Sequence, residues 1–95
     1  MSGDNQSEIG YNIESVAQEY LNQLEAIQMP YEDKEMIKYY IQASLEEVNS
    51  KEGLKPAVIG TAIDKVKESM VFGIAVADFM SSANRMIMEL EALMS

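Results

Sequence analysis

The amino-acid sequence predicts an all-α fold, in which a helical hairpin precedes a long C-terminal helix, for three or four helices in total. Apolar residues recur at intervals of three and four along each long segment, as on the buried face of an amphipathic helix. Both prolines stand where such a segment would begin. The hydrophobic share of 47% and the charged share of 24% in 95 residues are typical of one small globular domain. We therefore expect a single helical domain over residues 9–95, behind a polar, disordered or frayed N-terminus at residues 1–8.

The first helix is expected from about Ile9 to just before Pro30. Proline disfavours helical backbone at the residue before it and suits the first turn of a helix that follows. The glutamates of this segment lie off the apolar stripe, so one face is buried and the other is solvated. The stripe consists of Ile9, Ile13, Val16, Ala17, Tyr20, Leu21, Leu24 and Ile27.

The second helix is expected over about residues 30–49, and the short link before it favours an antiparallel hairpin. Met36, Tyr39 and Ala43 lie opposite its buried stripe, so this helix is expected to touch two neighbours. Residues 49–53 then form a turn that a glycine ends. The buried stripe consists of Ile37, Tyr40, Ile41, Leu45 and Val48.

The C-terminal segment carries two apolar stripes, which a helical wheel separates by roughly 120° or more. They overlap in Val71–Phe79, inside the apolar run Met70–Met80, MVFGIAVADFM, which has a single charge at Asp78. A helix that is apolar nearly all round must be covered on two sides. The first stripe consists of Ile59, Ile63, Val66 and Met70, and the second of Phe72, Val76, Phe79, Ala83, Met86, Leu90 and Leu93.

Three structures account for this change of face. The chain can break near Gly73 so that both halves fold onto one core, or one helix of roughly 38 residues can place its second half on a partner. The alternation of large and small residues over 70–77 also fits a strand, although the chain offers no second strand to pair with it. We favour the long helix over residues 57–94, because glycine alone is a weak helix breaker. Oligomerisation or a protein partner would then complete the bundle.

Asp78, the one charge in the apolar run, raises the question of a buried functional acid. On the wheel it lies on a polar face, on the side away from the second stripe. The sequence therefore predicts a solvated acid. The other residues of that face are Ser81, Ser82, Arg85 and Glu89.

The residue types required for most protein chemistry are missing. His, Cys and Trp are absent, which excludes Cys/His zinc sites, imidazole bases and histidine-dependent triads. The acids Glu32, Asp33 and Glu35 are explained by the first turn of a helix rather than by a bound cation. We therefore predict no catalytic, metal-binding or cofactor-binding residue, no small-molecule substrate and no enzymatic activity.

The chain is acidic, with a net charge of −9 and no Lys or Arg before Lys34. Nucleic acids and anionic membranes are disfavoured as partners, because both require clustered cations. The longest apolar run falls short of the roughly 20 residues of a membrane-spanning helix. The lack of cysteine and of a basic, apolar leader suits the cytoplasm.

Methionine is the positive signal for function, since five of the eight lie in the last third of the chain. Methionine side chains adapt to binding surfaces, although they also fill irregular cores. The predicted partner-binding residues are Phe72, Val76, Phe79, Met80, Met86, Leu90 and Leu93.

These observations predict a small acidic helical module that binds proteins, by self-association or as an adaptor, through its apolar, methionine-rich C-terminal helix. The layout of a hairpin followed by a long helix ending in IMELEALMS broadly resembles small subunits and chaperones of bacterial secretion machines. That resemblance implies a subunit or chaperone of a larger assembly. A third alternative is an acidic inhibitor that blocks a basic groove of its target with residues 4–33.

Overall fold

A computed structural model describes residues 5–48 and 55–94, with side chains from Asn12 onward. Within these ranges the fold is all-α, as predicted, with four helices and no strand. The first helix begins at Asn5, while residues 1–4 of the segment expected to fray, and the turn expected at 49–53, lie outside the described residues. The helices are α1 (Asn5–Ala26), α2 (Tyr31–Val48), α3 (Pro56–Phe72) and α4 (Ala77–Met94).

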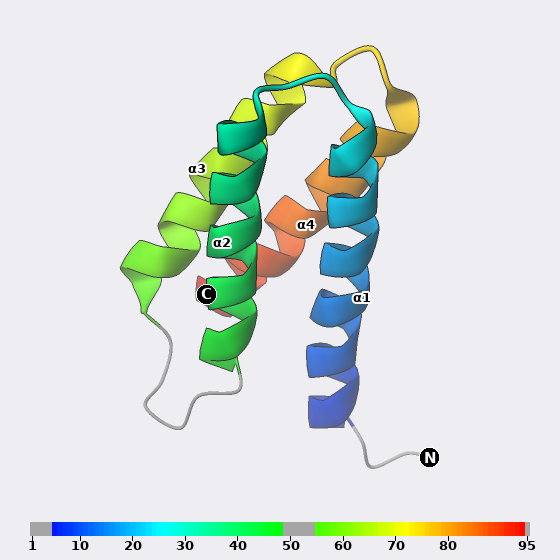
Figure 1. Ribbon diagram of the computed structural model, residues 1–95. Helices are drawn as coiled ribbons and strands as arrows, with labels where there is room; N and C mark the ends of the chain where they lie inside the picture. The colour runs from blue at the N-terminus through cyan, green and yellow to red at the C-terminus, as the bar shows by residue number, and fades with distance from the viewer. Residues whose placement is uncertain (1–4, 49–54, 95) are drawn as a thin grey trace.

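The four helices alternate in direction and form a bundle (Figure 1). α1 and α2 make the predicted antiparallel hairpin, and α3 packs against α2. α4 packs against both α1 and α3, and it crosses obliquely behind the hairpin in this view (Figure 1). As a result the α1–α2 turn and the α3–α4 turn lie at the same end of the bundle (Figure 1).

The core takes apolar side chains from all four helices and follows the predicted stripes closely. Burying such side chains is the main favourable contribution to folding, at about 1.5–3 kcal/mol for each large one. Three serines, Ser44, Ser69 and Ser82, are buried among them, which the apolar stripes did not predict. The buried apolar residues are Ile13, Ala17, Tyr20, Leu24, Ile27, Ile37, Ile41, Ile59, Ala62, Ile63, Val66, Phe79, Ala83, Met86, Ile87 and Leu90.

A buried hydrogen bond joins α1 to the end of α3. The Ser69 hydroxyl donates to the carbonyl oxygen of Val66 at 2.6 Å, and its Oγ lies 2.7 Å from the hydroxyl oxygen of Tyr20. Because the one Ser69 proton is used on Val66, the Tyr20 hydroxyl is the donor to Ser69. Burial raises the pKa of Tyr20 to about 12, so this phenol stays protonated and able to donate. The Tyr20 ring also packs on Phe79, with ring centroids 5.7 Å apart.

The prediction of one continuous C-terminal helix is wrong, because α3 ends at Phe72 and α4 begins at Ala77. The interpretation of residues 70–77 as a strand is wrong for the same reason. Gly73 has an ordinary backbone conformation, with φ −107° and ψ 21°, so a positive φ is not what requires glycine here. The requirement is space, since a Cβ at Gly73 would overlap carbons of the Phe79 ring.

Burial explains why the chain turns at this point. Folding α4 back places Phe79, Met86 and Leu90 in the core, each completely buried, and each contributes about 1.5–3 kcal/mol. The break gives up a few helical backbone hydrogen bonds, which are worth about 0.5–1.5 kcal/mol each. Burial outweighs that loss. The structure therefore matches the alternative in which the chain breaks near Gly73 and both halves fold onto one core.

Candidate protein-interaction surface

The candidate surface is apolar and is formed by the end of α3 and the turn that leads into α4. We call it the α3–α4 corner and define it by Val71, Phe72, Ile74 and Val76. Their exposed fractions are 73%, 47%, 72% and 43%. Gly73, which lies between them in sequence, is buried. Exposed apolar side chains that are scattered singly are ordinary, whereas these four lie within one short segment, 71–76, and a concentration of exposed apolar residues is typical of a binding surface.

The backbone of the corner is held by hydrogen bonds and packing. The Gly73 N–H donates to the carbonyl oxygen of Ser69 at 3.2 Å, and the Val76 N–H donates to that of Gly73 at 2.9 Å. The Met80 N–H then donates to the carbonyl oxygen of Val76 at 3.0 Å, which begins α4. Beneath the turn, the ring of Phe79 lies against Gly73. The exposed side chains therefore project from a turn that is already formed.

The predicted partner-binding residues divide into two groups in the structure. Phe72 and Val76 lie on the corner, and Met80 and Leu93 are partly buried at the edge of the core. The remaining residues are completely buried against the chain's own helices, so their side chains are not at the surface of this fold. These three are Phe79, Met86 and Leu90.

Val71 and Ile74 are the most exposed residues of the corner, and the stripe analysis did not select them. Both belong to the apolar run Met70–Met80 but to neither of its two stripes. The signal that could have identified them is an apolar residue for which no helical stripe accounts.

The polar face predicted around Asp78 is exposed at Asp78, Ser81 and Arg85, as expected, and Glu89 is partly exposed. Ser82 is the exception, because it is 2% exposed and its hydroxyl donates to the carbonyl oxygen of Phe79 at 2.9 Å. A serine hydroxyl that donates to a carbonyl oxygen of its own helix already has a hydrogen-bond partner, so the side chain can be buried. Arg85 reaches across to α1, where its Nη1 lies 3.3 Å from Oε1 of Glu19.

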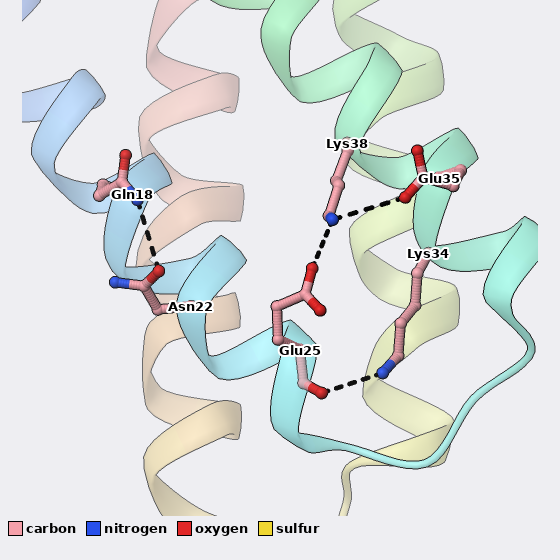
Figure 2. A network of polar contacts seen from close by, with 6 residues as sticks. All are labelled: Gln18, Asn22, Glu25, Lys34, Glu35 and Lys38. Carbon is pink, nitrogen blue, oxygen red and sulfur yellow. Dashed lines mark hydrogen bonds and ion pairs between the residues drawn. The ribbon is translucent and has the colours of Figure 1, made fainter.

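At the same end of the bundle, charged side chains close the α1–α2 turn (Figure 2). Nζ of Lys34 donates to the carbonyl oxygen of Glu25 at 3.1 Å, and Lys38 forms an ion pair with the Glu25 carboxylate. Nζ of Lys38 also lies 3.5 Å from Oε2 of Glu35. The hydrogen bond from Lys38 holds the pKa of Glu25 below its usual range, and the bond to Glu25 raises the pKa of Lys38.

A second set of exposed apolar residues lies on α2, at Tyr31, Met36 and Tyr39. α2 does touch two neighbours, α1 and α3, but these side chains face solvent rather than either helix. Exposed acids, including Glu32 and Glu35, interrupt them along the helix. They form a mixed surface instead of a continuous apolar one.

Other kinds of site receive less support from the structure. A depression between α1 and α4 is lined mainly by polar side chains, including Asn12, Ser15, Arg85 and Glu89. The described residues contain no cluster of three or more metal-ligating side chains and no helix long and apolar enough to cross a bilayer. The chain matches no protein-family model, no curated protein and no solved structure.

Proposed function

We propose that this protein is a non-enzymatic helical module that binds another protein through the α3–α4 corner. The observation that carries this proposal is the exposure of four apolar side chains on one hydrogen-bonded turn. Because these side chains are exposed, polar residues at the same positions would leave the core intact. Their apolar character is therefore better explained by a contact outside the chain than by folding.

The size of the corner indicates a reversible contact. With the exposed fractions above, four side chains of roughly 150–200 Å² each present about 400 Å² of surface. A partner that covers it buries a similar area of its own, so the contact totals about 800 Å², below the roughly 1,200–2,000 Å² of stable specific interfaces. Contacts of that size are typical of transient complexes. The size therefore favours an adaptor that engages and releases its partner over a permanently associated subunit.

The acidic-inhibitor alternative receives less support from the ion pairs of α1. Glu19 pairs with Arg85 and Glu25 pairs with Lys38, so two acids of the segment meant to meet a basic groove already have partners in this chain. The subunit or chaperone alternative remains a form of the same proposal, because it also requires an apolar contact surface.

Affinity capture from a native cell extract tests this function, with wild-type protein compared against Ile74→Glu. The control is Met88→Glu, because Met88 is 67% exposed and apolar but stands apart on α4. We expect at least one protein to bind the wild type and the control and to be lost from Ile74→Glu, as quantified by mass spectrometry. Identical sets of captured proteins for all three baits would contradict the proposal.

A further inference from the structure

We infer that the occupant of the α3–α4 corner is a basic amphipathic helix of another protein, rather than a second copy of this chain. This inference rests on the proposed function, since it names the class of partner for the same surface. Two properties of the structure carry it: the limited area of the corner and the charges around it.

The area of the corner is too small for a stable homodimer through this surface alone. A standard specific interface covers about 800 Å² on each partner, and the corner presents about 400 Å². One amphipathic helix of about three turns, roughly 18 Å long, is enough to cover four side chains. The corner therefore matches a single docked helix better than a second folded copy.

The charge of the chain opposes self-association and favours a basic partner. Each copy carries −9, so two copies brought together at the corner would repel. Asp78 lies in the first turn of α4, beside the corner, and Glu32 and Asp33 lie in the first turn of α2, at the same end of the bundle (Figure 1). None of these three acids has an ion-pair partner within the part of the chain that the structure describes.

The cations at this end offset only part of that negative charge. Lys38 pairs with the Glu25 carboxylate, whereas Lys34 donates to the carbonyl oxygen of Glu25 and keeps its positive charge. Lys67, one helical turn before Val71, is the exposed cation nearest the corner in sequence. An apolar surface bordered by unpaired acids suits a helix whose apolar face is flanked by Lys or Arg.

The test uses three synthetic 18-residue helical peptides and the full chain. The first has leucines on one face and lysines elsewhere, the second replaces the lysines with glutamates, and the third replaces the leucines with alanines. Binding is measured by isothermal titration at low salt, and the contacted residues are located by backbone NMR shifts. We expect the Leu/Lys peptide to bind at least tenfold more tightly than the other two, with shifts centred on residues 71–76.

Variants separate docking on the corner from general attraction to an acidic protein. Ile74→Glu adds an acid, so purely electrostatic binding of the Leu/Lys peptide would strengthen, whereas docking on the corner should weaken at least tenfold. Met88→Glu adds the same charge elsewhere and should leave the affinity within about twofold.

Several results would overturn the inference. They are equal binding of the Leu/Glu or Ala/Lys peptide, binding by Ile74→Glu as tight as wild type, or no binding at all. A concentration-dependent dimer that Ile74→Glu dissociates in sedimentation analysis would identify a second copy as the occupant instead. Loss of a captured cellular protein from Ile74→Glu would still support the proposed function in each of these cases, so the two failures are distinguishable.

Discussion

The two turns at one end of the bundle are held by opposite means. The α1–α2 turn places its apolar residues Ile27, at 5% exposed, and Met29, partly buried, against the core. Charged side chains of Glu25, Lys34 and Lys38 close it from outside. The α3–α4 turn has no charged residue over 73–76, GIAV, and it is held by backbone hydrogen bonds and by the Phe79 ring.

This difference shows what a turn requires and what it does not. The α1–α2 turn demonstrates that a tight connection in this fold can bury its apolar residue and face water with polar groups. The α3–α4 corner exposes apolar side chains, although the backbone hydrogen bonds and the Phe79 ring that hold its turn do not involve those side chains. The exposed apolar side chains are therefore not needed to form the turn, whose conformation is supported by the buried Phe79 ring beneath it.

The largest expected effect comes from the chain's two phenylalanines, which lie on either side of this division. Phe79 is completely buried and Phe72 is 47% exposed. We expect Phe79→Ala to lower the free energy of unfolding by about 3–5 kcal/mol, because it leaves a cavity beneath the corner. Phe72→Ala should lower it by less than about 1 kcal/mol while weakening binding of the Leu/Lys peptide. Urea unfolding measures both, and equal losses would show that the corner itself stabilises the fold.

The next effect compares Gly73 with Gly60. We expect Gly73→Ala to destabilise the protein by about 1–3 kcal/mol, because its Cβ would overlap the buried Phe79 ring. Gly60 lies inside α3 with no atom within 4 Å of a Cβ placed there. Gly60→Ala should therefore stabilise by about 0.5–1 kcal/mol, through helix propensity. If close packing against Phe79, rather than helix propensity, requires glycine at position 73, the unfolding temperatures of the two variants will shift in opposite directions.

The contrast between these glycines also explains how far the sequence predicted the fold. Helical periodicity identified the four apolar faces, because the spacing of buried residues is local information. The break at Gly73 depends on contacts between Phe79 and helices distant in sequence. Helix propensity is a local quantity, worth about 1 kcal/mol for glycine, and it carries no information about such contacts. Gly60, equally weak as a breaker, remains inside a helix.

The candidate surface was predicted in part, for a related reason. The stripe that selected Phe72, Val76 and Phe79 follows the buried face only from Phe79 onward, because Phe72 ends α3 and Val76 lies in the turn. Periodicity alone does not say where a helix will break, or whether its partner is this chain or another. Folding α4 back buries Phe79 and leaves Phe72 and Val76 outside. Val71 and Ile74 were visible only as apolar residues that no stripe required.

A comparable effect is expected at one of the buried serines, Ser69, which connects the end of α3 to Tyr20 of α1. Ser69→Ala removes the acceptor of the Tyr20 hydroxyl, and an unpartnered buried donor costs about 1–3 kcal/mol. Ser44 is equally buried, but its Oγ has no hydrogen-bond partner among the described residues, so Ser44→Ala should be neutral or slightly stabilising. Adding Tyr20→Phe to Ser69→Ala should recover part of the loss in urea unfolding. Equal losses for both serine variants would point to packing volume as the cause.

The smallest effect is expected at the charged side chains of the α1–α2 turn, with a defined pH dependence. Because the pKa of Glu25 is lowered by Lys38, the contribution of this pair is present above the ordinary glutamate pKa and is lost as pH falls through the lowered one. Because the pKa of Lys38 is raised, the contribution is also lost as pH rises through that value. Both groups are exposed, so Lys38→Met should change the urea midpoint only slightly at pH 7, and less still in high salt.

That small difference should disappear as pH falls through the lowered pKa of Glu25, because its carboxylate is then protonated. Lys67→Met is the matched control, because it removes the same charge from a lysine without an ion pair in the described residues. A midpoint difference for Lys38→Met that persists unchanged below the pKa of Glu25 would assign the role of Lys38 to packing of its aliphatic stem. Whichever result is found, Lys38→Met should bind the Leu/Lys peptide within about twofold of wild type. The charged side chains that close the α1–α2 turn are separate from the apolar side chains that form the α3–α4 corner.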